Sequence, residues 1–320
     1  MKRVAVLRGG PSEEYSVSMN TGRAVLSALQ KLDYPFKDIV ITKKGEWLDN
    51  GFTKQPEKAL DAIDVVFIAI HGQYGEDGQV QRILERKKVP YVGTRALPSA
   101  IAFNKELTKH TLLPYGVKMP RHRRVNREEL DRLNEEIPHI FEEIGRELFV
   151  KPVASGSSVG ARHIPHPEAL RSALTELLEQ YEQVLVEEYI RGKEATVGVL
   201  DDFRNEAHYA LPVVEIVPPR NALFYDAENK YDGTTDHVCP GRFTYHEKAN
   251  MEETARLVHK VIGCTHLSRS DFLVKDGEIY FLEVNTLPGF TEHSNYPYAA
   301  AEVGLEFPEL VRHLVESAHV

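Results

Sequence analysis

The sequence has little cysteine, no long hydrophobic run and no excess of basic residues. Its two cysteines, Cys239 and Cys264, are too few to cross-link 320 residues, which favours a reducing compartment such as the cytoplasm. The longest apolar run, residues 65–70, is far shorter than the roughly 20 residues that span a bilayer. The apolar segment at residues 4–7 is also too short for a signal peptide. We therefore expect a cytoplasmic protein with no membrane partner.

Basic residues are outnumbered by acidic residues. The chain has 48 acidic and 39 basic residues, which gives a net charge of -9. A protein that binds nucleic acid needs a basic face to neutralise phosphates, so the charge balance argues against a nucleic-acid partner. It leaves room for a small basic pocket that binds a nucleotide.

What is present is the composition of a folded globular protein, with 42% hydrophobic and 27% charged residues. At about 150 residues per domain, the length predicts roughly two domains. The pattern along the chain instead indicates three regions, which are residues 1–93, 94–187 and 188–320. The first should be α/β and the second α+β.

Short apolar runs and helical patterns alternate in the first region. Residues 4–7, 65–70 and 89–92 are predicted strands, and the alternation predicts a parallel sheet. Glu14 and His71 follow the first two strands. Either residue alone could simply cap a helix or a strand end. Because ligands bind at the carboxyl ends of parallel strands, we expect the two residues to share one crevice.

In the second region, helices are predicted at 97–113, 127–143 and 168–179, and strands at 148–152 and 184–190. In the third region, strands are predicted at 195–200 and 210–217, with a helix at 252–262. A hairpin is predicted over 268–284 with its turn at Asp276-Gly277. Between them, residues 218–241 form a long polar stretch, and loops of this length are usually functional or disordered.

The predicted hairpin carries Arg269, Asp271, Glu283 and Asn285 among apolar neighbours. Two carboxylates and an amide oxygen at one place are ligands suited to Mg²⁺. The alternative is a solvated polar face. A strict two-residue turn would set Glu283 opposite Ser270 and place Asp271 on the wrong face. The metal site therefore requires a bulge or an odd-length loop in this hairpin.

The loop at residues 151–160, Lys151-Pro-Val-Ala-Ser-Gly-Ser-Ser-Val-Gly160, is crowded with small residues. Small residues let backbone N–H groups approach an anion, although an ordinary strand connection is the alternative for such a loop alone. It is not a Walker A sequence.

Five motifs in order resemble those of the D-alanine–D-alanine ligases of the ATP-grasp superfamily, over nearly the whole chain. They are His71-Gly-x-x-Gly-Glu-Asp-Gly78, Lys151-Pro to Gly160, Glu187-Glu-Tyr-Ile-x-Gly-x-Glu194, Phe224-Tyr-Asp-x-x-x-Lys-Tyr231 and Glu283-Val-Asn-Thr-x-Pro-Gly289. The resemblance implies an N-terminal Rossmann-like domain at 1–93. It also implies a two-lobed ATP-grasp fold with a central subdomain at 94–187 and a C-terminal subdomain at 188–320. Residues 218–241 would be a lid over the site.

The resemblance also implies an activity. ATP would phosphorylate the carboxylate of one D-alanine, and the amine of a second D-alanine would displace the phosphate, for peptidoglycan precursor synthesis. The implied partners are the small molecules D-alanine and ATP, two Mg²⁺ ions with Mn²⁺ as a substitute, and a second copy of the chain in a homodimer.

Residue roles follow from the same resemblance. The residues implied to bind ATP are Lys105, Lys151, Ser158, Glu187, Glu188, Ile190, Glu194, Phe224, Lys230, Leu273 and Leu282. The implied metal ligands are Asp271, Glu283 and Asn285. Arg269 and the backbone N–H of Gly289 would stabilise the oxyanion of the tetrahedral intermediate.

The substrates have implied residues of their own. Glu14 would bind the ammonium group of the first D-alanine with His71 nearby, and Ser294 would hold the carboxylate of the second. Ser157 and Tyr231 would join Glu14 in a hydrogen-bonded triad that closes the lid, which excludes water from the acyl phosphate. Tyr231 favours an amine as nucleophile.

Two positions depart from the family pattern. Asn104 stands where the family commonly has Asp, and Asn295 stands where it has Leu or Met. Asn295 borders the pocket for the second substrate, so a related ligase that uses D-lactate, D-serine or another amino acid is an alternative. A non-catalytic nucleotide-binding protein is a second alternative. For most single residues on these lists, an ordinary structural role also stays open.

Overall fold

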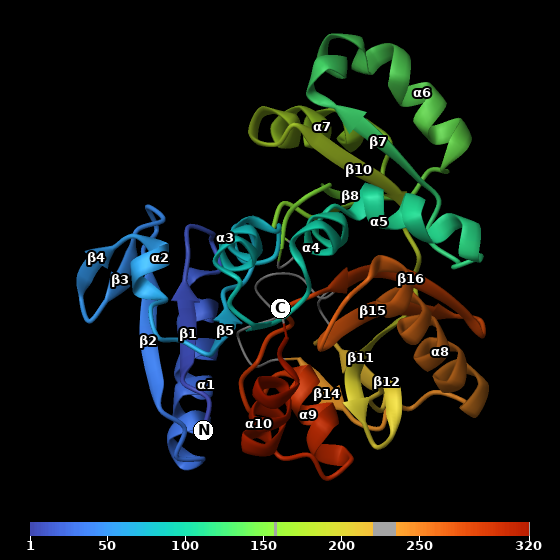
Figure 1. The fold of residues 1–320 in the computed structure, drawn as a ribbon. Helices are drawn as coiled ribbons and strands as arrows, with labels where there is room; N and C mark the ends of the chain where they lie inside the picture. Colours follow the sequence, from blue (N-terminus) through green and yellow to red (C-terminus); the bar gives the residue numbers. More distant parts are fainter. Residues whose placement is uncertain (157–158, 220–234, 320) are drawn as a thin grey trace.

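In the part of the chain that the structure describes, helices pack on three β-sheets (Figure 1). The computed structural model describes residues 1–156, 159–219 and 235–319. The sheets occur in chain order, and each consists of strands from one stretch of the sequence. The mixed α/β and α+β architecture agrees with the predicted fold class. The predicted domain boundaries stay predictions.

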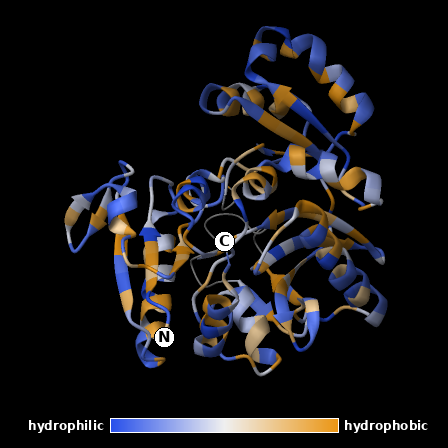
Figure 2. Ribbon diagram, viewed as in Figure 1, coloured by the Kyte–Doolittle hydropathy of each residue, from blue (hydrophilic) through white to orange (hydrophobic). Residues whose placement is uncertain are grey.

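The first sheet has the strand order β4-β3-β2-β1-β5-β6, with bounds Phe52–Lys54, Trp47–Asp49, Phe36–Ile41, Val4–Gly9, Val65–Ala69 and Tyr91–Val92. The pairs β1–β2, β1–β5 and β5–β6 are parallel, as predicted. Strands β3 and β4 extend the sheet in antiparallel fashion and were not predicted. The strands of this sheet carry hydrophobic stretches (Figure 2), and residues 4–7 of β1 and all of β5 are apolar because helices cover both faces of the sheet.

The helices on the first sheet come from both ends of the chain. One face packs on α1 (Tyr15–Lys31) and on α9 (Asn295–Glu302) and α10 (Phe307–Ser317). The other face packs on α2 (Pro56–Ala59) and α3 (Gln79–Lys87). The C-terminal helices therefore join the last part of the chain to the first sheet. No helix within the described ranges is long and apolar enough to cross a membrane.

The second sheet is antiparallel in the order β7-β10-β8-β9, with bounds His122–Asn126, Gln183–Glu188, Leu148–Pro152 and Arg162–Ile164. Helices α6 (Leu133–Glu143) and α7 (Glu168–Gln180) share one apolar core with it. The predicted helix at 127–143 begins with a 3₁₀ segment, Arg127–Arg132, and only its second part is α-helical.

A single helix predicted at 97–113 is wrong, since the structure has two helices and a 3₁₀ turn there. Helix α4 spans Ala96–Phe103, α5 spans Lys105–Leu112, and the turn is Leu113–Tyr115. Asn104 between the helices has an extended backbone, and its side chain accepts a hydrogen bond of 3.0 Å from the backbone N–H of Leu107. The amide therefore acts as a helix N-cap, which breaks one periodic segment into two.

The third sheet is antiparallel in the order β14-β13-β11-β15-β16, and β12 also pairs with β11. The bounds are Asp236–Val238, Val214–Val217, Lys193–Phe203, Leu267–Lys275 and Glu278–Asn285, with Glu206–Ala210 for β12. Helix α8 (Tyr245–Ile262) packs on one face.

Two predictions for this part of the chain are wrong. The strand predicted at 210–217 is divided between β12 and β13, because Pro212 lies between them and has no N–H for a ladder. Strand β14 occupies part of the stretch 218–241 that was predicted to be a loop.

We predict that Leu314→Ala in α10 weakens the fold. Leu314 is fully buried in the core that α10 shares with the first sheet. The cavity left by the substitution should lower the free energy of unfolding by about 2–5 kcal/mol. Urea denaturation measures this loss. The matched control is Leu97→Ala, since Leu97 is 72% exposed and its loss should change stability by about 0.5 kcal/mol or less. Equal effects of the two substitutions would contradict this placement of α10.

Candidate functional site

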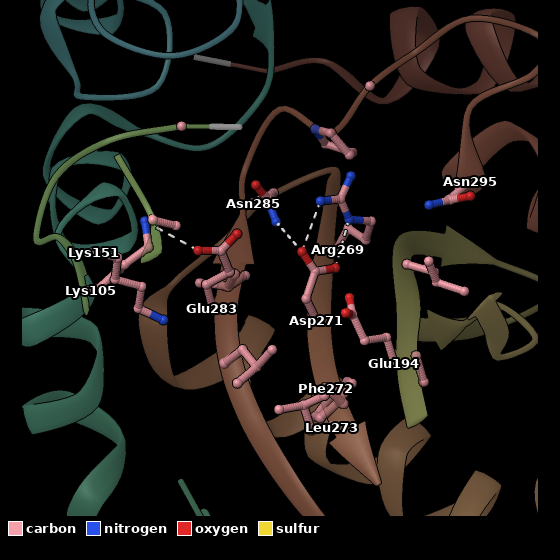
Figure 3. Close-up of a pocket in the computed structure, with 18 of the residues that line it drawn as sticks. Lys105, Lys151, Glu194, Arg269, Asp271, Phe272, Leu273, Glu283, Asn285 and Asn295 are labelled. Atoms are coloured by element: carbon pink, nitrogen blue, oxygen red, sulfur yellow. Dashed lines mark hydrogen bonds and ion pairs between the residues drawn. The ribbon is translucent and has the colours of Figure 1, made fainter. Parts of the chain in front are cut away.

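The hairpin of β15 and β16 contains the irregularity that the predicted metal site requires. Its turn is Asp276-Gly277, both with positive φ, and Lys275 pairs with Glu278. The register shifts between Asp271 and Phe272, and beyond this point Asp271 faces Glu283 and Arg269 faces Asn285. Since opposite residues of an antiparallel pair share a face, all four polar side chains lie together (Figure 3). The predicted bulge is confirmed.

Asp271 is held by three neighbours. The Nε atom of Arg269 donates to Oδ1 of Asp271 at 2.9 Å, and the Nη2 atom donates to Oδ2 at 2.9 Å. Asn285 donates to it from Nδ2 at 3.0 Å, and the Thr196 hydroxyl on β11 donates at 2.7 Å. These contacts fix the orientation of the carboxylate. Across the hairpin, Glu283 lies 3.2 Å from the ammonium group of Lys105 at the start of α5.

A buried cluster of one carboxylate and two lysines joins the second sheet to α5. Glu187 on β10 is 2.8 Å from Nζ of Lys109 and 2.7 Å from Nζ of Lys151. Burial alone would raise the pKa of Glu187, but the two ammonium groups lower it to about 2. Burial lowers the pKa of Lys109, which is 1% exposed at its side chain. The ionised carboxylate positions the Lys151 side chain at the cleft.

Glu14 and His71 come together at the carboxyl ends of β1 and β5, as expected. His71 is buried, which lowers its pKa, and its Nδ1 donates to the Leu287 carbonyl at 3.0 Å. Its Nε2 then accepts from the Thr21 hydroxyl at 2.8 Å. This imidazole is thus a neutral link between the first sheet and the loop after β16.

Glu14 lies against the small-residue loop of the second region. A Cβ atom on Gly156 would lie 2.2 Å from the Oε2 atom of Glu14, and one on Gly72 would lie 2.6 Å from it. Glycine at both positions leaves room for the carboxylate. The loop after β8 and the loop after β1 therefore meet at Glu14.

Ser294 and Gly289 are close to each other in the segment between β16 and α9. Ser294 is the N-cap residue of α9, and its hydroxyl accepts from the Thr291 N–H at 3.0 Å. A Cβ atom on Gly289 would lie 3.3 Å from this hydroxyl. The backbone of residue 289 thus passes close to the Ser294 side chain.

One cavity of 1320 Å³ connects these groups. Every predicted site residue within the described ranges lines it, namely Glu14, His71, Lys105, Lys151, Glu187, Glu188, Ile190, Glu194, Arg269, Asp271, Leu273, Leu282, Glu283, Asn285, Gly289 and Ser294. The predicted residues Ser157, Ser158, Phe224, Lys230 and Tyr231 lie outside the described residues.

Sequence reasoning missed three residues of this site. Lys109 lies one helical turn after Lys105, and that spacing was the available signal. Glu76 belongs to the motif at residues 71–78 and lines the cavity. Burial and the nearby Glu14 carboxylate raise the pKa of Glu76 to about 8, so it is largely protonated at neutral pH. Thr196 had no local signal, because only the pairing of β11 with β15 brings it to Asp271.

Two antiparallel sheets that border one cavity lined by lysines, arginines and carboxylates define the ATP-grasp class of proteins. The family models for the D-ala D-ala ligase N-terminus and C-terminus match residues 3–94, in two overlapping segments, and residues 112–316. The chain belongs to the D-alanine–D-alanine ligase family.

Individual relatives agree with this family. A D-alanine–D-alanine ligase of Fervidobacterium nodosum is 37% identical, and the match covers 98% of each chain. The VanG D-Ala:D-Ser ligase of Enterococcus faecalis superposes with a TM-score of 0.84 at 30% identity, again over 98% of each chain. The D-alanine–D-alanine ligase of Bacillus anthracis complexed with ATP gives 0.78 at 28% identity, covering 99% of this chain and 97% of that one.

We predict that Glu187→Gln destabilises the protein, because it leaves two buried ammonium groups side by side. The expected loss in the free energy of unfolding is about 3–5 kcal/mol at neutral pH. Glu187 has its pKa below the ordinary value, so its contribution is present above about pH 4.5 and is lost as the pH falls toward 2. Urea denaturation at several pH values should show the difference from the wild type narrowing over this range.

The control for this variant is Glu182→Gln, which breaks an exposed pair with Arg127. It should cost about 1 kcal/mol or less. If Glu187→Gln cost no more than Glu182→Gln, the buried cluster would not have the role described.

Proposed function

We propose that the protein joins two D-alanine molecules to D-alanyl-D-alanine with ATP as the energy source. The observation that supports this most directly is the single cavity between the second and third sheets. It brings Lys105, Lys151 and Arg269 together with Asp271 and Glu283. A triphosphate needs cations and a metal ion. The amine and the carboxylate of the amino-acid substrates would instead use Glu14 and Ser294, which line the same cavity.

The proposed reaction has two steps. The carboxylate of the first D-alanine attacks the γ-phosphorus of ATP, which forms D-alanyl phosphate and releases ADP. The amine of the second D-alanine attacks the carbonyl carbon, the tetrahedral intermediate expels phosphate, and the amine loses a proton. Both steps place charge on oxygen atoms, so positioned cations and N–H donors are the groups that accelerate them.

The metal-site residues fit Mg²⁺ or Mn²⁺. Asp271, Glu283 and Asn285 offer oxygen donors on one face of a hairpin, which is the donor set that hard divalent ions prefer. The ions, two in the proposed active state, would neutralise charge on the phosphate groups. Arg269 and Lys105 pair with the carboxylates in the structure and are positive groups at the same place.

Nucleotide binding is assigned to the cleft between the sheets. Lys105 and Lys151 would contact phosphate oxygens, and Lys230 and Ser158 would add contacts there. The carboxylates Glu187, Glu188 and Glu194 would face the adenine and ribose. Ile190, Phe224, Leu273 and Leu282 would form the apolar walls. The support from the structure is the shared cavity for those that it describes.

The amino-acid substrates would bind between Glu14 and Ser294. Glu14, with His71 behind it, would bind the ammonium group of the first D-alanine, and Ser294 would hold the carboxylate of the second. Arg269 and the N–H of Gly289 would stabilise the oxyanion, while Ser157 and Tyr231 would close the lid with Glu14. The proximity of Gly156 to Glu14 and of Gly289 to Ser294 supports these two ends of the site.

The wider setting follows from the same proposal. The dipeptide is a precursor of peptidoglycan, and both ATP and D-alanine would be supplied in the cytoplasm. We also propose a homodimer as the assembled form.

A second candidate is ligation of D-alanine to a different second substrate, such as D-serine or D-lactate. Asn295 favours it, because this polar side chain lines the cavity next to Ser294, where the family commonly has Leu or Met (Figure 3). An amide could hydrogen-bond a hydroxyl group on the second substrate. The structural similarity to a D-Ala:D-Ser ligase is consistent with this reading.

Phosphate release from MgATP tests the two candidates together. We expect release with D-alanine alone and none with L-alanine, because Glu14 and Ser294 should select one hand of the substrate. Mixtures of D-alanine with D-serine or D-lactate, followed by mass spectrometry of the products, identify the second substrate. An absence of D-alanine-dependent release by ATP-binding protein would refute both, and D-alanyl-D-alanine as sole product would refute the second.

We predict that Glu283→Gln abolishes turnover and leaves the fold intact. The substitution removes a metal ligand and its charge, which should cost several kcal/mol of transition-state stabilisation, or about 100-fold or more in kcat. Steady-state phosphate release measures kcat, and circular dichroism checks the fold. The matched control is Glu278→Gln at the other end of β16, where an exposed carboxylate pairs with Lys118. Wild-type turnover of the Glu283 variant would refute the metal assignment.

A further inference from the structure

Three side chains with metal-binding chemistry meet on the third sheet, outside the cavity described above. Asp201 lies on β11, His208 on β12 and His259 on α8, and one potential ligand atom of each lies within 4.8 Å of the others. The Nδ1 atom of His208 is 2.7 Å from Oδ1 of Asp201, and the Nε2 atom of His259 is 3.0 Å from the same oxygen. None of the three residues lines the cavity that holds the proposed active site.

His259 provides the independent observation that points to a ligand. Its side chain is 0% exposed, and its Nδ1 is 2.7 Å from the Ser268 hydroxyl. The other ring nitrogen, Nε2, lies 3.0 Å from Oδ1 of Asp201 but is poorly aligned for a hydrogen bond to it. The ring direction therefore misses the carboxylate oxygen. A buried imidazole nitrogen that lies at a cluster without a hydrogen bond is costly unless a further atom satisfies it.

Asp201 is fixed in an orientation that leaves one oxygen for this cluster. Its Oδ2 atom accepts from the backbone N–H of His266 at 2.7 Å, and its backbone carbonyl is 2.8 Å from Nε2 of His313. Its Oδ1 atom faces the two imidazoles.

We propose that Asp201, His208 and His259 form a binding site for a divalent transition-metal ion of the Zn²⁺ type. Two imidazoles and one carboxylate are the donors that such ions take, with water as a further ligand. The hydroxyl of Ser268 orients His259 through its second ring nitrogen, as outer partners do for metal-bound histidines. His208 is 34% exposed at its side chain, which leaves a route for the ion and a position for water.

Bound metal would add a shared ligand set to three elements that already meet by packing, strand pairing and the two contacts of Asp201 with the histidines. Asp201 and His208 belong to neighbouring strands of one hairpin, and His259 belongs to the helix that covers the sheet. The ion would tie the hairpin to α8 at residues that do not line the nucleotide cleft. Its effect is therefore on stability and not on the chemical step.

A plain hydrogen-bonded Asp–His cluster is the competing explanation, since His208 is placed to donate from Nδ1 to Asp201. The decisive experiment is a titration of EDTA-stripped, untagged protein with Zn²⁺ or Co²⁺ in excess Mg²⁺, which occupies oxygen-rich sites. We expect one equivalent of Zn²⁺ and visible Co²⁺ absorption from nitrogen and oxygen ligands. The melting temperature should rise with Zn²⁺.

Variants test whether the bound equivalent of Zn²⁺ lies at the cluster of Asp201, His208 and His259. His208→Ala and His259→Gln should each weaken Zn²⁺ binding by more than about 100-fold, and Ser268→Ala by about 10–100-fold. His208→Ala is the safer variant, because its side chain is partly exposed and its loss leaves no buried cavity. His246→Ala, at an exposed position of α8, and Glu283→Gln, in the nucleotide cleft, should bind as the wild type does.

Three results would overturn the proposal. They are the absence of Zn²⁺ binding by the wild type, unchanged binding by His208→Ala, and loss of the equivalent in Glu283→Gln. Activity is not needed for any of these measurements, so they stand or fall independently of the proposed ligation reaction.

Discussion

The register shift between Asp271 and Phe272 in the β15–β16 ladder is the constraint on which the candidate site depends. Without it, Glu283 would pair with Ser270 and point to the face that packs on α8. A slip of one residue moves a side chain to the opposite face of a sheet, so the carboxylate would lie in an apolar core. The extra residue in β16 is Leu282, which lies on the cleft side with Glu283. One irregularity thus supplies both a polar and an apolar part of the cleft.

Charge pairing explains how a buried cleft can hold so many ionised groups. Glu187 is paired with two lysines, Asp271 with Arg269, and Glu283 with Lys105. Each pairing offsets the cost of removing charge from water, which is several kcal/mol per ion in a folded protein. In the proposed active state, the phosphates would replace these carboxylates as partners of the lysines. The metal ions would replace Lys105 and Arg269 as partners of Glu283 and Asp271. The net charge of -9 therefore describes the chain as a whole and not this cleft.

The sequence predicts those parts of the molecule that carry a local signal. Continuous apolar runs identified β1 and β5, and ordered motifs identified residues that line one cavity. The need for a bulge was visible because a regular hairpin would have separated Asp271 from Glu283. The break at Asn104 was missed, since a capping amide interrupts a helical pattern that is otherwise continuous. The division at Pro212 was missed as well, although proline was the available signal.

Features that depend on distant pairing had no such signal. Thr196 reaches Asp271 only through the β11–β15 ladder, and the short strands β3 and β4 have too few residues for a clear period. Asp201, His208 and His259 fit no metal-binding spacing along the chain, and only the fold brings them together.

A crystal structure with ADP and Mg²⁺ bound tests the central claim most directly. The account predicts that the ammonium groups of Lys105 and Lys151 contact phosphate oxygens, and that Asp271 and Glu283 contact Mg²⁺. In that structure, the Lys105–Glu283 pair of 3.2 Å would be broken. A nucleotide bound elsewhere, or one bound here while Mg²⁺ avoids both carboxylates and the pair stays intact, would contradict the account.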